Sequence, residues 1–275
     1  MKFWDFVNER LKIYKYKEIS KIPSPWTDDP ILRDYKFCNA QRHLDRTSQS
    51  LLKNVINNIS LNSKQKIMNI IFLRLFNRPE HFDIFPIIHD WGSQKDLVIG
   101  ICEDCYKNKK KIFNNAYQIN TGHDNKHIQI IENLAAIDYD ELDEILKTKT
   151  YKEILKYLED HIRAVGSFIA AQILLDCGYD SSITGITGDD FLIIGPGAAE
   201  GLRMMGLEDP KKYEAAIYHL WNNQPYLPDL QPYPERSMYR QGHMSLMDIQ
   251  HCLCEWRKYH QWKNGIGMRR KYKGN

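Results

Sequence analysis

Hydrophobic positions recur along most of the chain at the 3.6-residue spacing of an amphipathic helix, whereas alternation with a period of two is nearly absent. The spacing predicts helices over 2–17, 31–58 (one or two), 64–77, 95–106, 124–137, 139–147, 150–160 and 245–259. Three prolines within 22–30 end the first helix, and four prolines make 224–236 an irregular, aromatic-rich connection. The pattern therefore predicts an all-α protein.

Composition allows a substantial core within these 275 residues, since 43% are apolar and 16 Tyr, 10 Phe and 6 Trp add large buried surfaces. We expect a single helical domain over 1–275, with room for two lobes. No stretch reaches the roughly 18 uncharged apolar residues of a membrane span, and the start differs from a signal peptide. We therefore expect a cytoplasmic monomer that does not bind membranes.

Charge is unevenly distributed, although the net charge is only +3. A basic tail, residues 257–275, contains no acidic residue and carries Arg257, Lys258, Lys263, Arg269, Arg270, Lys271 and Lys273. A second basic cluster comprises Lys107, Lys109, Lys110 and Lys111, and acidic residues concentrate in 132–144. Segregated basic patches suit a polyanionic partner such as DNA. The charge distribution alone is explained equally well by runs of charged residues that are simply exposed to solvent and bind no partner.

The stretch 155–176 has the form of two helices joined by a Val-Gly turn. The second helix starts near Ser167, and Ala170 and Ala171 are small enough to let a neighbouring helix approach closely. A turn that opens a helix leaves free backbone N–H groups at the positive end of the helix dipole, and these suit a DNA phosphate. The candidate DNA contacts here are Val165, Gly166, Ser167, Phe168 and Gln172. An ordinary pair of antiparallel helices is the alternative.

An aspartate pair follows this hairpin in Gly188-Asp189-Asp190-Phe191. The arrangement resembles helix-hairpin-helix DNA glycosylases, in which a catalytic Asp lies shortly after the second hairpin helix. The resemblance implies that Asp190 or Asp189 is catalytic, because a carboxylate can stabilise positive charge on the sugar and orient water. A helix cap or turn is the alternative role for both. No Lys lies between Val165 and Asp176, which disfavours a covalent amine mechanism.

Longer blocks of the sequence resemble one particular helical family. The blocks are Pro25–Leu32, Tyr35–Ala40 with Arg42 and Leu44–Arg46, Phe76–Arg78, Gly166 with Phe168, Ala170 and Gln172, Asp190-Phe191 with Gly195–Ala198, and Asp248–Glu255 with Lys258-Tyr259. They resemble the α-glutamyl/putrescinyl-thymine pyrophosphorylases and the helical domain attached to 5-hydroxymethyluracil DNA kinases. The resemblance implies double-stranded DNA with modified pyrimidines as the partner, and a glycosylase-like helical fold.

Several reactions are compatible with this resemblance. The leading hypothesis is a monofunctional glycosylase that flips and excises a hypermodified pyrimidine, such as a glycosylated hydroxymethyl base, from bacteriophage DNA in antiviral defence. The alternative is a transferase that acts on pyrophosphorylated 5-hydroxymethyluracil in DNA. A third hypothesis is a DNA-binding module that recruits a kinase encoded elsewhere, since these residues contain no Walker A sequence.

Polar residues of the first block form a further candidate site. They could hold a phosphate or a base edge, or equally form an ion-pair network that fixes the proline-rich segment against a helix. They are Asp28, Asp29, Asn39, Arg42, Asp45 and Arg46. Gly195, Gly197 and Lys258 complete the predicted DNA contacts.

We predict no metal and no cofactor. Cys102 and Cys105 have a metal-like spacing, but Cys252 and Cys254, the residues that could complete four thiolates, would point to different faces of a helix. Small buried apolar residues are the better interpretation of these cysteines. Four aromatic residues could stack on a flipped base, although a role in the core is favoured: Trp221, Tyr226, Tyr233 and Tyr239.

Overall fold

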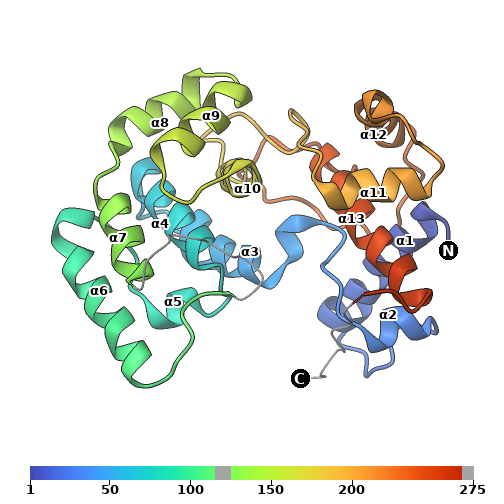
Figure 1. The fold of residues 1–275 in the computed structure, drawn as a ribbon, viewed down its shortest axis with the longest axis horizontal. Helices are drawn as coiled ribbons and strands as arrows, with labels where there is room; N and C mark the ends of the chain where they lie inside the picture. Colours follow the sequence, from blue (N-terminus) through green and yellow to red (C-terminus); the bar gives the residue numbers. More distant parts are fainter. Residues whose placement is uncertain (115–124, 268–275) are drawn as a thin grey trace. The chain divides into compact units, whose positions relative to one another are not determined.

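The computed structural model describes residues 1–114 and 125–267, and its regular elements are helices (Figure 1). They are α1 (Phe3–Tyr14), α2 (Pro30–Asp34), α3 (Arg46–Leu51), α4 (Ser63–Phe76), α5 (His81–Ile84), α6 (Trp91–Lys107), α7 (Lys126–Ala135), α8 (Tyr139–Thr148), α9 (Tyr151–His161), α10 (Ser167–Cys177), α11 (Pro196–Met204), α12 (Tyr213–Asn222) and α13 (Leu246–Lys263). Short π or 3₁₀ turns are η1 (Lys15–Ile19), η2 (Arg42–Leu44), η3 (Leu52–Ile56) and η4 (Pro210–Lys212). The predicted all-α class is confirmed.

The prediction of one or two helices over 31–58 is only partly correct. Helix α2 ends at Asp34, and residues 35–41 are not helical before η2, α3 and η3 follow. Side-chain carboxylates bind the backbone N–H groups of Cys38, Asn39 and Arg42. Because those donors are satisfied without a helix, Phe37 and Ala40 reach the core from an irregular segment. Helix α12 was not predicted, and α13 continues four residues past the predicted end at Tyr259, to Lys263.

The described residues divide into two compact units. Unit 1 comprises 1–45, 191–233 and 240–267, and unit 2 comprises 46–114, 125–190 and 234–239. In unit 1, α13 is the central helix and packs against α1, α2, α11 and α12 (Figure 1). In the hydrophobic core of unit 1, the ring of Phe37 packs against the rings of Tyr259 and Trp262.

Helices α11 and α13 approach each other closely because α11 carries glycines at the contact. A Cβ atom on Gly201 would lie 2.6 Å from the carbonyl oxygen of Leu253, and one on Gly197 would lie 2.3 Å from the Sγ atom of Cys254. Backbone atoms cannot move aside as a flexible side chain can. The missing side chain at Gly201 is therefore needed for this helix pair.

We expect Gly201→Ala to lower the free energy of unfolding by about 1–3 kcal/mol, because the added methyl group overpacks the α11–α13 contact. Urea unfolding followed by circular dichroism measures the change. Gly100→Ala in α6 is the matched control: its Cβ meets nothing within 4 Å, so helix propensity should raise stability by about 0.5–1 kcal/mol. Equal effects of the two substitutions would contradict the packing explanation.

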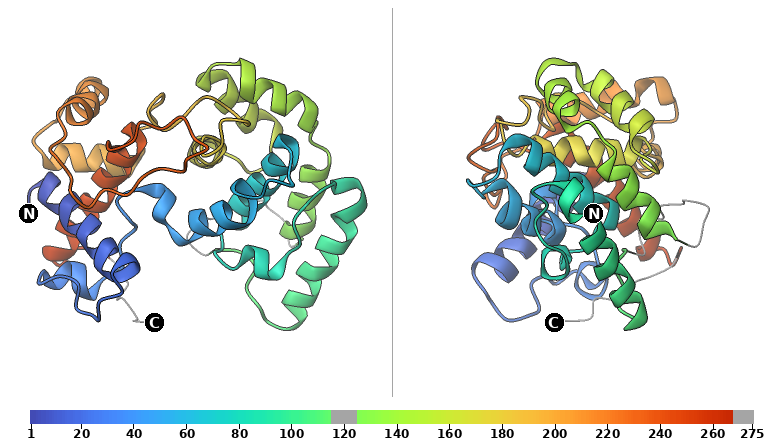
Figure 2. Two further views of the ribbon diagram at one scale, coloured as in Figure 1. Left: turned by 180° about the vertical axis from the view of Figure 1, so that it is seen from behind. Right: turned by 90° about the vertical axis from the view of Figure 1, so that its left-hand side faces the viewer.

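Unit 2 is built around α4, which packs against α7, α8 and α10, while α6 and α7 lie side by side (Figure 2). Helix α4 begins with a capping box between Asn62 and Gln65, and such reciprocal hydrogen bonds satisfy N–H groups that a helix start leaves free. Its buried face also carries charged residues. Lys66 Nζ lies 2.6 Å from Asp180 Oδ2, and Arg74 forms a bidentate ion pair with Asp176.

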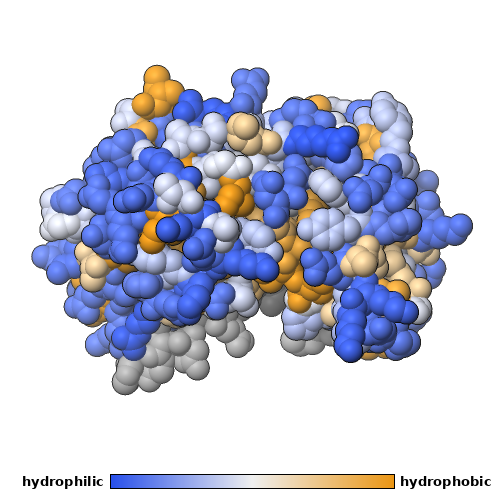
Figure 3. Space-filling view, turned by 90° about the horizontal axis from the view of Figure 1, so that it is seen from above, coloured by the Kyte–Doolittle hydropathy of each residue, from blue (hydrophilic) through white to orange (hydrophobic). Residues whose placement is uncertain are grey.

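The face drawn in Figure 3 is largely hydrophilic, with smaller apolar patches. Among the described helices, none is both long enough and apolar enough to span a lipid bilayer.

Candidate functional site

The hairpin predicted near 155–176 is present as α9, a turn over 162–166, and α10. Gly166 caps α10 with φ −103° and ψ 177°, an extended conformation that any residue adopts. A Cβ atom there would meet nothing within 4 Å. A side chain at Gly166 would therefore fit this turn, whose left-handed residue is Ala164, at φ 64°.

The predicted hairpin contacts differ in their exposure. Gly166, Ser167 and Phe168 are exposed at the start of α10, with the Phe168 side chain at 58%. Val165 and Gln172 retain only 6% and 5% exposure, so both side chains lie within unit 2. The accessible part of the predicted phosphate site is thus the backbone over 166–168, at the positive end of the α10 dipole.

The aspartate pair lies in a tight turn after α10. Asp190 Oδ2 accepts hydrogen bonds from the backbone N–H of Thr187 at 2.7 Å and from its hydroxyl at 2.9 Å. Asp190 is exposed, and within the described chain no hydrogen bond reaches its Oδ1 atom. Asp189 is half-buried, and its backbone N–H donates to Thr187 Oγ1. Thr187 therefore holds one oxygen of Asp190 while the other stays accessible.

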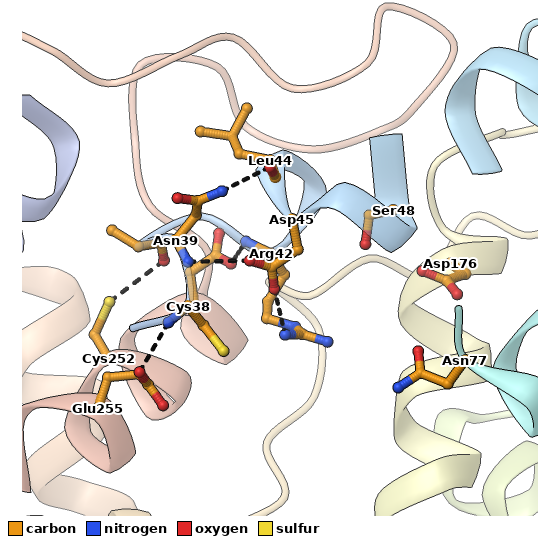
Figure 4. A network of polar contacts seen from close by, with 12 residues as sticks. Cys38, Asn39, Arg42, Leu44, Asp45, Ser48, Asn77, Asp176, Cys252 and Glu255 are labelled. Atoms are coloured by element: carbon orange, nitrogen blue, oxygen red, sulfur yellow. Dashed lines mark hydrogen bonds and ion pairs between the residues drawn. The ribbon is translucent and has the colours of Figure 1, made fainter. Parts of the chain in front are cut away.

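In unit 1, polar residues of the first block meet those of the last block (Figure 4). Asp248 Oδ1 accepts the N–H of Arg42 at 2.8 Å, across 206 chain positions. Glu255 Oε2 accepts the N–H of Cys38 at 2.9 Å, across 217 positions. Two blocks that are distant in sequence therefore form one site, which we call the loop–α13 site: residues 36–45 with Asp248, His251, Glu255 and Lys258.

Most charges of the loop–α13 site are paired. Arg42 Nη1 lies 2.6 Å from Asp45 Oδ2, and Asn39 donates to Asp45 Oδ1 at 3.0 Å. Lys258 pairs with Glu255, and its ammonium group also lies 5.0 Å from the ring centroid of Phe37. Arg42 and Lys258 thus each belong to an ion pair, with Asp45 and Glu255 respectively, and Asn39 is hydrogen-bonded to the first of these pairs. This arrangement supports the structural alternative for these residues, and a ligand would have to compete with existing pairs.

The remaining polar residues of the first block lie elsewhere. Asp29 caps α2 by accepting the N–H groups of Ile31 and Leu32, and it also accepts the hydroxyl of Tyr259. Asp28 is exposed, and Arg46 begins α3 in unit 2. Asp29 therefore has a structural role that needs no ligand.

Two neutral groups complete the loop–α13 site. Burial raises the pKa of the Cys38 thiol to about 12. Burial, followed by the positive charge of Arg42, lowers the pKa of His251 to about 4. At neutral pH the thiol is protonated and the imidazole is uncharged. Sequence reasoning did not single out His251, although it lies in the last family block.

Other predicted contacts have packing roles. Gly197 lies against Cys254, as described above, and Gly195 caps α11 beside Gln250. Of the aromatic group, Tyr233 and Tyr239 are buried and the Trp221 indole donates to the carbonyl of Met244. Tyr226 is 87% exposed and lines a cavity of about 410 Å³ with His243 and Gln224.

The basic patches differ in how much of them the structure describes. Lys107 is the last residue of α6, Lys109, Lys110 and Lys111 follow it, and all four are exposed. In the basic tail, Arg257, Lys258 and Lys263 belong to α13. Arg269, Arg270, Lys271 and Lys273 lie outside the described residues.

Metal ligation through the cysteine pairs finds no support. Cys102 and Cys105 are buried in α6 of unit 2, whereas Cys252 and Cys254 belong to unit 1. Cys252 donates to the carbonyl of Ala40. Over residues 1–114 and 125–267, the group whose side chains could hold an ion is instead Cys38, Asp45 and His251.

Comparison with known proteins identifies the family. Residues 1–266 match the family described as "5-hmdU DNA kinase, helical domain". The chain belongs to this family. A relative named "5-hmdU DNA kinase", from Bacillus phage SP10, is 28% identical over 290 residues. That alignment covers 93% of this chain and 44% of the relative, so the chain spans less than half of the relative's length. No solved structure matches the chain.

Proposed function

We propose that the chain binds duplex DNA that contains pyrophosphorylated 5-hydroxymethyluracil and replaces the pyrophosphate with a nucleophile. The family match over 1–266 carries this proposal. A kinase would phosphorylate the hydroxymethyl group, a second phosphoryl transfer would complete the pyrophosphate, and the helical family member would use this activated base. The relative's additional length leaves room for such a kinase in that protein. The same chemistry would place this chain in a phage-infected cell.

The reaction forms one bond and breaks another at the exocyclic carbon. An amine nitrogen attacks the 5-methylene carbon, the carbon–oxygen bond breaks, and pyrophosphate leaves with the bonding electron pair. The amine must also lose a proton. Asp190 suits the role of acceptor, because Thr187 fixes its Oδ2 atom and its Oδ1 atom remains accessible. The N–H groups at the start of α10 and the exposed lysines over 107–111 suit phosphate groups.

A second candidate function is base excision by a monofunctional glycosylase of the helix-hairpin-helix type. One observation favours it: the α9–α10 hairpin is followed by an exposed, oriented carboxylate at Asp190. Helix α10 contains no lysine that could attack the sugar. In this mechanism Asp190 would orient water and stabilise the oxocarbenium-like sugar. Because Asp190 would act in both reactions, only the reaction products distinguish transfer from base excision.

One experiment separates these functions. The full chain is incubated with duplex DNA that contains pyrophosphorylated 5-hydroxymethyluracil and an amine donor, with glycosylated hydroxymethyl DNA and thymine DNA in parallel. Pyrophosphate release together with an added amine mass in the digested nucleosides supports transfer. A released base together with alkali-labile sites supports excision. Tight DNA binding without either product would overturn both proposed reactions. It would instead support the hypothesis of a DNA-binding module that recruits a kinase.

We expect Gly166→Ala to weaken DNA binding by about tenfold while the chain stays folded. The folded chain has room for the methyl group, but a phosphate held by the α10 backbone would lose its close approach. Fluorescence anisotropy with modified duplexes and thermal unfolding test the two parts. Gly185→Ala is the matched control for general surface effects, since Gly185 is exposed in unit 2 and a Cβ atom there also meets nothing within 4 Å. Unchanged DNA affinity in Gly166→Ala would show that the α9–α10 hairpin does not contribute to DNA binding.

A further inference from the structure

Three side chains with metal-ligand chemistry meet in the loop–α13 site. Cys38 comes from the irregular segment after α2, Asp45 directly follows η2, and His251 lies on α13. One sulfur, one carboxylate oxygen and one ring nitrogen all lie within 4.8 Å of one another. Ligands held 2.0–2.3 Å from a tetrahedral ion lie about 3–4 Å apart. Small side-chain movements would therefore place all three around one ion.

The His251 ring has a nitrogen that no other group of the described chain uses. Its Nε2 atom is buried, and no hydrogen-bond partner for it exists in the described chain. A buried polar atom without a partner destabilises a fold by about 1–3 kcal/mol. Its neighbours are a thiol and a carboxylate, both of which ligate metals.

The surrounding contacts hold the other two side chains in place. The backbone of Cys38 is fixed on both sides, since its N–H donates to Glu255 and its carbonyl accepts from Arg10. Asp45 uses one lone pair on each oxygen for Asn39 and Arg42. A carboxylate has about four lone-pair positions, so two remain, and one of them can bind an ion. Hydrogen bonds of this kind orient ligands in known metal sites.

We propose that Cys38, Asp45 and His251 bind one Zn²⁺ ion whose fourth coordination position is open to water. The mixed sulfur, nitrogen and oxygen donor set favours zinc over Mg²⁺ or Ca²⁺, which prefer oxygen ligands alone. Three protein ligands with one exchangeable position are typical of a zinc ion that takes part in chemistry or binds a substrate oxygen. The expectation of no metal was based on cysteine spacing, which did not include this group.

Zinc binding is measured on the full chain after treatment with a chelator and dialysis. Native mass spectrometry and competition with a chromophoric chelator should give one tightly bound Zn²⁺ per chain. Co²⁺ in place of Zn²⁺ should show a thiolate-to-metal charge-transfer band, which requires a cysteine ligand. These readouts need no DNA, so failure of the zinc proposal and failure of the proposed function are distinguishable.

Cys38→Ser and His251→Gln should each weaken zinc binding at least about 100-fold. Cys254→Ser is the matched control, since this thiol also belongs to unit 1 but lies outside the group of three ligands. The zinc affinity of this variant should equal that of the unaltered chain. Circular dichroism checks that each variant folds. Should a variant unfold, the Co²⁺ spectrum of the unaltered chain decides the question. Absence of bound zinc, a Co²⁺ spectrum without the thiolate band, or wild-type affinity in both variants would overturn the proposal.

Discussion

Asp190→Asn should lower turnover by about 100-fold to 10,000-fold while DNA affinity changes less than tenfold. A positioned carboxylate that accepts a proton or stabilises a transition state contributes to rate by about this much and little to ground-state binding. The substitution keeps the size of the side chain and most of its contact with Thr187. Single-turnover rates at saturating DNA, with anisotropy for affinity, measure the two quantities.

Asp189→Asn is the control for this prediction. It adjoins Asp190 in the same turn but is half-buried, whereas Asp190 is exposed. One carboxylate should therefore matter far more than the other. Full activity in Asp190→Asn would show that the Thr187–Asp190 turn is not part of the active site, whichever product the enzyme makes.

Asp176→Asn should lower the free energy of unfolding by about 3–5 kcal/mol, because it leaves the buried Arg74 guanidinium without its counter-ion. Both partners are almost fully buried, with 1% and 3% of their side chains exposed. Arg74 Nη2 also donates to Ser48 Oγ at 3.0 Å, so the pair connects α3, α4 and α10. A lower urea midpoint with an unchanged slope would show the loss.

The exposed pair between Lys156 and Asp160 provides the comparison. Its atoms lie 2.8 Å apart, but 76% and 51% of the side chains are exposed. Solvent screens such a pair, so Asp160→Asn should leave the urea midpoint unchanged. If both substitutions shift the midpoint equally, burial is not the reason for the effect of Asp176.

The sequence by itself determined the helical class and the positions of most long helices. Helices α4, α8 and α9 fall within one or two residues of their predicted bounds. This success has a local cause: an amphipathic helix buries residues three and four positions apart, so its pattern is visible within a short window. The α9–α10 hairpin followed from local signals of the same kind.

The tertiary structure alone decided the conformation of 35–41 and the contents of the loop–α13 site. The hydrophobic pattern there predicted a helix, but from more than 200 positions away Glu255 binds the N–H of Cys38, and Asp248 binds that of Arg42, the residue directly after the segment. The sequence likewise directed attention to Cys102 and Cys105, whereas the close group is Cys38, Asp45 and His251. Local periodicity reports only which face of a segment is apolar. Which distant carboxylate or imidazole meets that segment depends on how the helices pack, and no short window of sequence contains that information.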